Sequence, residues 1–322
     1  MPTALLTNQY APALQALIRA EAPAGFDIIA LNQTSHADIV ARASEADYLL
    51  VGGRIPIDAA VLNAATRLRM VQRTGVGLDA MDLDAIESRG IPVYVNPGVN
   101  AQSVAEHTLM LMLAVLRRLP VVHRSLRDGD WKKHELGIRN RDLSGRRVGL
   151  IGLGHIGQAV ARLLQPFGVI LSYHKRQRLP NPDEQTLGLN YQPLDELIAE
   201  SEVVSLHCPL TPDTRNLLSR ERIGHMRPGA VLINTARGGL VDEPALIEAL
   251  QHGHLGGAGL DAFVQEPLPA ESPLRTLDNV VLSPHISGIT RDSFQEMMRR
   301  AFHNIAAFEA GELEVIAPMR LR

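Results

Sequence analysis

The feature that most restricts the fold of this chain is a regular alternation of short apolar runs with longer helical patterns. In the first hundred residues, the apolar runs lie at 4–7, 26–29, 47–51, 69–72 and 92–95. Helical patterns separate them at 10–22, 35–44, 56–65 and 79–89. Because strands that alternate with helices usually pair in parallel, this order predicts an α/β unit with helices on both faces of a parallel sheet.

A second series of the same kind begins at residue 147. Its strands are predicted at 147–151, 169–173, 202–206, 230–234, 256–260 and 279–282, and its helices at 155–167, 193–200, 214–226 and 242–252. Long helices are predicted at 101–119, between the two series, and at 290–311, after the second. The polar segment 121–144 contains the only tryptophan, Trp131, and is predicted to be a loop or arm outside the core. The order therefore predicts two parallel α/β units joined by two long helices, and 322 residues are sufficient for both.

Composition excludes several classes of partner. The net charge is -3 and the isoelectric point is near 6.5, whereas a nucleic-acid-binding protein usually has a basic face. The single cysteine, Cys208, permits no internal disulfide and is compatible with a reducing compartment. No signal-peptide pattern is present, and the longest apolar stretch, 109–116, is too short to cross a bilayer. We expect a cytoplasmic protein without a nucleic-acid or membrane partner.

A glycine-rich segment, Gly152-Leu-Gly154-His-Ile-Gly157, follows the predicted strand 147–151 directly and opens a predicted helix. In such a context the first glycine permits a tight turn and the second lets the backbone approach a pyrophosphate. The third lets the helix lie close to the sheet. The helix N-terminus offers N–H groups to the phosphates. This segment predicts a dinucleotide site, with a glycine turn that binds no ligand as the alternative.

The residues after the next strand, 169–173, indicate which dinucleotide is preferred. An NAD site usually has Asp or Glu at this point, about 20 residues beyond the glycines, to bond the ribose hydroxyls. This chain has His174-Lys175-Arg176-Gln177-Arg178 instead, with three cations and no carboxylate. Because cations attract a 2′-phosphate, we predict that NADP(H) is preferred and that NAD(H) is possible. A solvated basic loop is the alternative.

Further motifs occur in an order that resembles a known family. They are residues 202–212 (EVVSLHCPLTP), 233–239 (INTARGG), 259–263 (GLDAF) with Glu266-Pro267, 283–288 (SPHISG), 74–79 (TGVGLD) and 96–100 (NPGVN). Together with the glycine turn, they resemble the D-isomer-specific 2-hydroxyacid dehydrogenases, which include hydroxypyruvate/glyoxylate reductases and phosphoglycerate dehydrogenases. The resemblance spans most of the chain.

This resemblance implies a fold and an assembly. The fold class is α/β, with two Rossmann-like, doubly wound parallel-sheet domains joined by two long hinge helices. A flavodoxin-like substrate-binding domain is implied for 1–100 and 289–322, and a Rossmann dinucleotide-binding domain for 101–288. The active site is implied in the cleft between them. The segment at about 121–144 corresponds to the dimerisation arm of the family, so a homodimer is expected.

The resemblance also implies the site residues. The catalytic residues are Arg237, Glu266 and His285. The substrate is held by Arg237 and His285 and by two first-domain loops, through Gly53, Arg54, Val76 and Gly77. The cofactor-binding positions are Gly152, Gly154, His155, Ile156, Gly157, His174, Lys175, Arg176, His207, Cys208, Pro209, Thr214, Thr235, Ala236, Asp261, Ser287 and Gly288. No metal site is predicted, because the histidines show no ligand spacing.

Arg237, Glu266 and His285 suit the reduction of a 2-keto acid, which needs a hydride on carbon and a proton on oxygen. Arg237 can bind the carboxylate and the carbonyl oxygen with its fork of donors and can stabilise the developing alkoxide. His285 can donate the proton, and Glu266 would fix its tautomer and favour the imidazolium. Singly, each could be an ordinary surface or core residue. Their shared place at strand ends of a parallel sheet favours an active site.

The substrate is less restricted by the sequence. Formate-oxidising relatives pair the histidine with a glutamine, so Glu266 argues against formate. The missing ribose carboxylate favours an NADPH-dependent glyoxylate/hydroxypyruvate reductase, with 3-phosphoglycerate or another 2-hydroxy acid as alternatives. A non-enzymatic, dinucleotide-sensing corepressor of the same fold is the alternative from another class.

Overall fold

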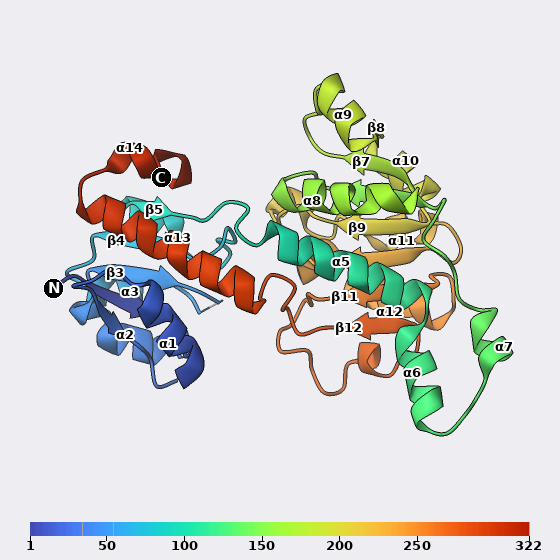
Figure 1. Cartoon of the computed structure of the whole chain (residues 1–322), viewed down its shortest axis with the longest axis horizontal. Helices are drawn as coiled ribbons and strands as arrows, with labels where there is room; N and C mark the ends of the chain where they lie inside the picture. Colours follow the sequence, from blue (N-terminus) through green and yellow to red (C-terminus); the bar gives the residue numbers. More distant parts are fainter. Residues whose placement is uncertain (34, 54, 322) are drawn as a thin grey trace. The chain divides into compact units, whose positions relative to one another are not determined.

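The computed structural model describes residues 1–33, 35–53 and 55–321, which form two compact units (Figure 1). Unit 1 contains Met1–Asn100 and Thr290–Arg322, and unit 2 contains Ala101–Ile289. The chain therefore passes between the units twice, after Asn100 and after Ile289. Each unit is built on its own parallel sheet.

The sheet of unit 1 has five parallel strands in the order β2-β1-β3-β4-β5. They are β1 (Thr3–Leu6), β2 (Asp27–Ile29), β3 (Tyr48–Val51), β4 (Met70–Arg73) and β5 (Val93–Tyr94). This is the flavodoxin-like order, and it reverses between β1 and β3. Residues of β1 and β3 are buried along their whole length, as expected for parallel strands covered on both faces.

Helices cover both faces of this sheet. They are α1 (Pro12–Glu21), α2 (His36–Arg42), α3 (Ala59–Ala64), α4 (Leu83–Glu87), α13 (Arg291–Glu309) and α14 (Leu313–Ile316). On one face, Phe302 and Ile305 of α13 join a core with Tyr48 and Tyr94 of the sheet. The C-terminal helix is therefore a core element of the unit that contains the N-terminus.

Three buried amides tie α13 to this sheet. Asn304 Nδ2 donates to Gln72 Oε1 at 3.1 Å and to Asn96 Oδ1 at 3.2 Å. Asn96 Nδ2 donates in turn to the carbonyl oxygen of Met297 at 3.1 Å. An unpaired buried polar group costs about 1–3 kcal/mol, so these amides favour one register of α13 on the sheet.

The sheet of unit 2 has seven parallel strands in the order β12-β11-β10-β9-β6-β7-β8. They are β6 (Arg147–Ile151), β7 (Ile170–His174), β8 (Leu189–Tyr191), β9 (Val203–Leu206), β10 (Val231–Asn234), β11 (Gly257–Leu260) and β12 (Val280–Leu282). The order reverses between β6 and β9. Ligands of doubly wound sheets bind at such a switch point, beyond the carboxyl ends of the strands.

Helices α5 (Ala101–Leu116) and α8 (His155–Leu164) lie side by side on one face of this sheet (Figure 1). Glycines in β11 let α5 pack directly on the strand. A Cβ on Gly257 would lie 2.7 Å from Val115 Cγ1, and one on Gly259 would lie 2.9 Å from Leu111 Cβ. Helices α10 (Leu194–Glu200), α11 (Arg220–His225) and α12 (Glu243–Gln251) contribute to the second apolar core of unit 2.

These two Rossmann-like units confirm the predicted fold class, and several elements differ locally from the prediction. Helix α11 begins at Arg220 rather than at residue 214. Helix α5 ends at Leu116 rather than at residue 119. The segment expected to be a loop or arm contains two short helices, α6 (Leu119–Arg127) and α7 (Lys133–Gly137), neither of which has a buried residue. The structure also has α9 (Asn181–Leu187) and β8, which the sequence pattern did not predict.

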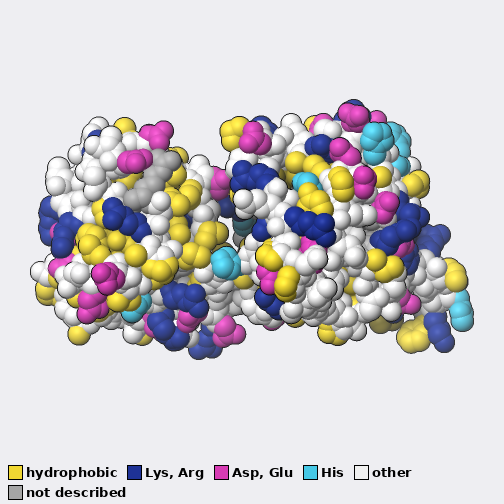
Figure 2. Space-filling view, turned by 90° about the horizontal axis from the view of Figure 1, so that it is seen from above, with side chains coloured by type: hydrophobic (Ala, Val, Ile, Leu, Met, Phe, Trp, Pro, Cys, Tyr) yellow, Lys and Arg dark blue, Asp and Glu magenta, His cyan; other side chains and the backbone are white. Residues whose placement is uncertain are grey.

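The surface carries charges of both signs. Figure 2 shows Lys and Arg side chains interspersed with Asp and Glu on the face in view. Among the described residues, no helix has the length and apolar character that a membrane span requires. In the same part of the chain, no group of three or more His, Cys, Asp and Glu side chains is placed to hold a metal ion.

Candidate active site

The glycine-rich turn connects β6 to α8 at the switch point of unit 2. Gly152 has φ +95°, which favours glycine, and a Cβ there would lie 2.5 Å from the backbone carbon of His207. A Cβ on Gly157 would overlap the carbonyl oxygen of Gly152. Both glycines are therefore required by close backbone approach, one to the segment after β9 and one within the turn itself.

Unlike Gly152 and Gly157, Gly154 faces open space, because a Cβ there would meet no atom within 4 Å. It is the N-cap residue of α8, and no side chain caps the first N–H groups of this helix, which begins with His155 and Ile156. Free N–H groups at a helix N-terminus beside open space suit a pyrophosphate. The turn thus fits a bound dinucleotide.

The segment after β7 begins beside this turn, since the Gly152 N–H donates to the carbonyl oxygen of His174 at 2.9 Å. Within the described part of the chain, the side chains of Lys175 and Arg176 have no hydrogen-bond or ion-pair partner. The third cation differs from the prediction. Arg178 donates from Nε and Nη2 to the two carboxylate oxygens of Glu184, each at 2.8 Å, so its charge is compensated. Two cations rather than three remain for a ligand.

The loop after β9 carries four of the predicted cofactor positions, His207, Cys208, Pro209 and Thr214. Burial lowers the pKa of His207 to about 4, so this imidazole is neutral at neutral pH, and its Nε2 lies 2.9 Å from Ser205 Oγ. Burial also raises the pKa of Cys208 to about 11, so its thiol is protonated and is no nucleophile. Thr214 Oγ1 closes the loop by donating to the Pro209 carbonyl oxygen at 2.7 Å.

Arg237 follows β10 on a turn that is fixed by Asn234. The Asn234 side chain accepts from the Ala236 N–H at 3.0 Å and donates to the Arg237 carbonyl oxygen at 2.9 Å. Thr235 is anchored to α5, because its Oγ1 lies 3.0 Å from Thr108 Oγ1. Sequence reasoning missed Asn234, although an Asn at a strand end is a common turn-forming residue.

Gly238 brings the loop of Arg237 against the loop that carries Glu266. A Cβ on Gly238 would overlap the backbone carbonyl group of Phe263, so only glycine allows this approach. Glu266 is itself held to the same loop, because its Oε1 accepts from the Phe263 N–H at 2.9 Å. Gly238 is a second residue that sequence reasoning missed, since its role depends on a partner far along the chain.

The structure joins Glu266 and His285 directly. His285 Nδ1 lies 3.0 Å from Oε1 and 3.1 Å from Oε2 of Glu266, and the two side chains are 31% and 15% exposed. His285 has φ +54°, an uncommon conformation for a residue other than glycine. Because Glu266 occupies Nδ1, the other ring nitrogen, Nε2, is the one suited to exchange a proton with a ligand.

Asp261 holds the backbone of the loop that carries His285. Its fully buried carboxylate accepts from the N–H groups of residues 286–287 at 2.9 and 2.8 Å and from Ser283 Oγ at 2.7 Å. Ser283 Oγ also lies 2.8 Å from Nε2 of His107 on α5. Asp261 was predicted as a cofactor position, and its contacts give it a clear structural role as well. Neither Ser283 nor His107 was among the predicted site residues, and the two lie far apart along the chain.

The predicted substrate loops follow neighbouring strands of unit 1. Gly53, with φ +57°, comes after β3, and Val76 and Gly77 come after β4, with the Val76 side chain 50% exposed. Arg54, which was also predicted, lies outside the described residues.

Arg73 ties these two loops together. Its Nη1 donates to the carbonyl oxygen of Val51 at 3.0 Å, and its Nε donates to that of Gly77 at 2.7 Å. The guanidinium therefore links the end of β3 to the loop after β4. Sequence reasoning missed this residue, because nothing in the strand pattern distinguishes Arg73 from an exposed strand-end cation.

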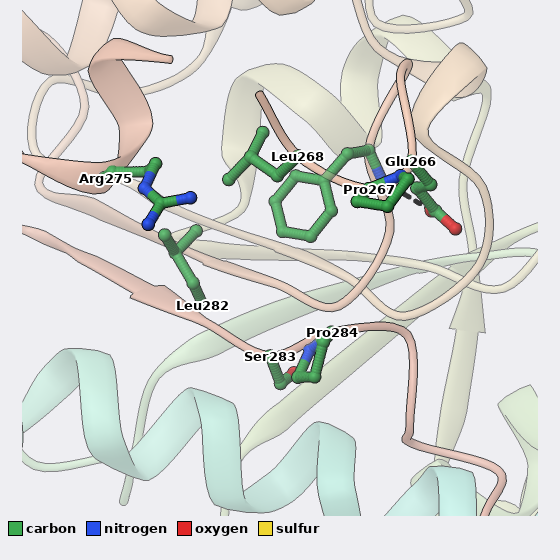
Figure 3. Close-up of a pocket in the computed structure, with 8 residues that line it drawn as sticks. Glu266, Pro267, Leu268, Arg275, Leu282, Ser283 and Pro284 are labelled. Atoms are coloured by element: carbon green, nitrogen blue, oxygen red, sulfur yellow. Dashed lines mark hydrogen bonds between the residues drawn. The ribbon is translucent and has the colours of Figure 1, made fainter. Parts of the chain in front are cut away.

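A pocket of about 700 Å³ lies in unit 2 beside the loops of Glu266 and His285 (Figure 3). Pro267 and Leu268 lie on one side of it and Leu282 on another, with Glu266 at its edge (Figure 3). Its lining residues are Phe263, Glu266, Pro267, Leu268, Arg275, Leu282, Ser283 and Pro284. The volume is within the range of small-molecule sites.

Comparison with known proteins agrees with this geometry. Residues 109–287 match the NAD-binding domain of D-isomer-specific 2-hydroxyacid dehydrogenases, which is more than half of the chain. The chain belongs to this family. The dehydrogenase is 39% identical over 277 residues to a glyoxylate reductase of Korarchaeum cryptofilum, covering 85% of this chain and 83% of that protein.

Two further relatives are similar over most of the dehydrogenase. It is 38% identical over 293 residues to a D-3-phosphoglycerate dehydrogenase of Mycobacterium bovis, covering 91% of this chain and 54% of that longer protein. The crystal structure of TT0316 protein from Thermus thermophilus has a TM-score of 0.84 and 39% identity, covering 96% of this chain and 97% of that one. The family and reaction class predicted from the sequence are confirmed. The chain is an oxidoreductase that acts on the CH–OH group of 2-hydroxy acids and uses a nicotinamide dinucleotide.

Proposed function

We propose that this dehydrogenase reduces glyoxylate or hydroxypyruvate with NADPH. The observation that carries the cofactor assignment is the loop after β7, where Lys175 and Arg176 follow directly on the strand end that is bonded to Gly152. Glu184, a buried acid of this region, is paired with Arg178, which weakens its repulsion of a 2′-phosphate. Similarity to a glyoxylate reductase supports the substrate class.

The catalytic roles follow from the contacts of His285. When bound, the nicotinamide dinucleotide supplies the hydride that reaches the keto carbon. His285 donates the proton from Nε2 to the carbonyl oxygen, which completes the alcohol. Glu266, at 3.0 Å from Nδ1, orients the ring and stabilises the imidazolium before the proton leaves. In the oxidation direction, neutral His285 takes the proton back.

Arg237 binds the substrate in this proposal. Its planar guanidinium offers paired donors to the carboxylate and to the carbonyl oxygen, and its permanent charge stabilises the alkoxide that develops. Gly53, Val76 and Gly77 contribute backbone contacts to the same carboxylate. The positive φ of Gly53, +57°, and the hydrogen bond from Arg73 to the Gly77 carbonyl oxygen support this assignment.

A homodimer is also proposed, through the segment that contains α6 and α7. The side chains of Leu126, Trp131 and Ile138 are all exposed, and Trp131 is 80% exposed. Large apolar residues that are left uncovered on a short arm are typical of an interface. Light scattering of the purified protein should give twice the mass of the chain, and replacement of Trp131 by Asp should shift the mass towards the monomer.

A substrate panel measured with NADPH and with NADH tests the proposal. We expect the highest kcat/KM for glyoxylate or hydroxypyruvate with NADPH. Faster turnover of 3-phosphoglycerate with NAD⁺ would assign the chain to the phosphoglycerate branch instead. Absence of turnover across the whole panel, with intact dinucleotide binding, would favour a non-enzymatic sensor.

A further inference from the structure

The side chains of Tyr173, Arg178 and Glu184 form a cluster beside the loop of residues 174–180. We term this cluster the Glu184 clamp. The carboxylate of Glu184, which is 5% exposed, accepts from the Tyr173 hydroxyl at 2.6 Å. It also accepts two parallel hydrogen bonds from Arg178, each at 2.8 Å. Bidentate arginine–carboxylate pairs fix the geometry of both partners. The clamp consists of Tyr173, Arg178 and Glu184.

The clamp and its neighbours hold both ends of the loop. At the start, the carbonyl oxygen of His174 accepts from Gly152, and its ring Nδ1 lies 3.0 Å from the Gln192 carbonyl oxygen. At the far end, the Leu179 N–H donates to the Tyr173 hydroxyl at 2.8 Å. The Arg178 guanidinium also lies 5.5 Å from the centre of the Tyr191 ring. Residues 175–177 lie between these two anchors.

The charge state of the clamp is fixed across the pH range of an enzyme assay. Hydrogen bonds from Arg178 and Tyr173 lower the pKa of Glu184 to about 2, so its carboxylate stays ionised. Burial and the bond to Glu184 raise the pKa of Tyr173 to about 12, so its hydroxyl stays protonated. Arg178 is therefore permanently paired, and the attraction for an anion comes from Lys175 and Arg176.

We infer that Arg178 is a positioning residue for cofactor specificity, which through the Glu184 clamp holds Lys175 and Arg176 in place for a 2′-phosphate. A loop fixed before binding loses less conformational freedom when the ligand arrives, so affinity increases without a new contact. This inference rests on the proposed preference for NADPH. It differs from a reading in which all three cations touch the phosphate.

Calorimetric dissociation constants for NADPH and NADH test the inference without relying on activity. With Arg178→Ala, we expect the Kd of NADPH to rise about tenfold and that of NADH to change less than twofold. Arg220→Ala is the matched control, because it removes an exposed arginine paired with Glu248 elsewhere in unit 2. It should change neither constant. An equal loss for both cofactors with Arg178→Ala, or no loss, would overturn the inference.

Glu184→Gln separates positioning from charge. Removal of a negative charge near a phosphate site should strengthen NADPH binding if only charge matters. NADPH binding should also become stronger if Arg178, once it is no longer paired with Glu184, binds the phosphate itself. The clamp inference predicts the opposite, a Kd for NADPH about fivefold higher with NADH unchanged, because the bidentate pair is lost. Tighter or unchanged NADPH binding would refute it. Thermal unfolding of each variant verifies that the protein remains folded.

The double variant Lys175→Ala/Arg176→Ala distinguishes failure of the inference from failure of the proposed cofactor. If this variant binds NADPH as the wild type does, the cofactor assignment itself is wrong and the clamp has no specificity to control. If it loses NADPH while Arg178→Ala and Glu184→Gln keep it, the cofactor assignment stands and the clamp inference is wrong.

Discussion

The first strand-to-helix connection of each unit occupies the same topological place. The two connections differ in the free space and the backbone N–H groups that they offer to a ligand. In unit 2, the turn after β6 has Gly154 beside open space, and α8 begins with uncapped N–H groups. In unit 1, α1 begins with Pro12, which has no N–H to offer. There the space next to Gly52 is taken by Tyr10 and Asn8, since a Cβ on Gly52 would lie 2.8 Å from the Tyr10 hydroxyl oxygen.

The comparison shows that sheet order alone does not make a dinucleotide site. Both sheets reverse their strand order beside this connection, between β1 and β3 and between β6 and β9. A few residues decide whether a dinucleotide can bind. Unit 2 has glycines and free N–H groups at this connection, whereas unit 1 has a proline and bulky side chains. Function thus depends on the turn rather than on the fold.

The largest effect is expected at the chemistry that we assign to unit 2. His285→Ala should lower kcat by about 10²–10⁴-fold, which is the usual contribution of a positioned proton donor. The Kd of NADPH should change less than threefold. Steady-state kinetics and calorimetry provide the two measurements. Equal loss of cofactor binding would mean that His285 supports the nucleotide site rather than proton transfer.

The space for the phosphates at the turn after β6 can be filled by a single methyl group at Gly154. Gly154→Ala should weaken both NADPH and NADH by at least about tenfold, because the Cβ would occupy space that the phosphates need. The fold should tolerate it, since no protein atom lies within 4 Å of that Cβ. Gly137→Ala, at another unobstructed glycine, is the control. If Gly154→Ala binds both cofactors normally, the phosphates do not lie at this turn.

Unit 1 is expected to affect the substrate and not the cofactor. Arg73→Met removes the donors that join the carbonyl oxygens of Val51 and Gly77, so the loop after β4 loses this link to the end of β3. We expect the KM for the 2-keto acid to rise about tenfold with NADPH binding unchanged. Arg67→Met, at an exposed arginine paired with Asp47, is the control. A change in cofactor affinity equal to the change in KM would contradict this division of roles between the units.

The smallest effect concerns His207, which directly follows β9 at the switch point of unit 2. Its folded pKa of about 4 lies below the ordinary value of 6.5, so protonation favours the unfolded chain. The contribution of neutral His207 to the free energy of unfolding is fully present above pH 6.5 and is lost as the pH falls towards 4. Between pH 7.5 and 5, urea unfolding should show wild type losing about 1–2 kcal/mol more than His207→Gln. Parallel pH curves for the two proteins would contradict a neutral buried imidazole.

The turn and its strands were predictable because their signals are local. Gly152, Gly154 and Gly157 stand at fixed offsets after an apolar run. Close backbone approach requires glycine at the first and third of these positions. The pairing of Glu266 with His285, 3.0 Å apart, was expected from the family resemblance rather than from spacing. Sequence motifs therefore anticipated residues that act through local geometry or shared family patterns.

Residues that act through distant partners were not predictable. Gly238 is needed only because Phe263 lies against it, and Ser283 links Asp261 to His107, which is 176 positions away. Edge elements were missed for another reason. Strand β8 has only three residues and pairs on one side, so it has little apolar pattern to detect. Helices α6 and α7 bury no residue, so they belong to neither apolar core of unit 2.

The placement of α13 in the core of unit 1 has a consequence for biosynthesis. Phe302 and Ile305 cover one face of a sheet whose strands all come from the first 94 residues. Residues Ala101–Ile289 must be made before α13, which takes roughly ten to forty seconds at translation rates of about 5–20 residues per second. During that interval the nascent chain exposes an uncovered apolar sheet at the ribosome. Chaperones that bind early in translation should therefore hold the N-terminal hundred residues while the unit made after them completes its own core.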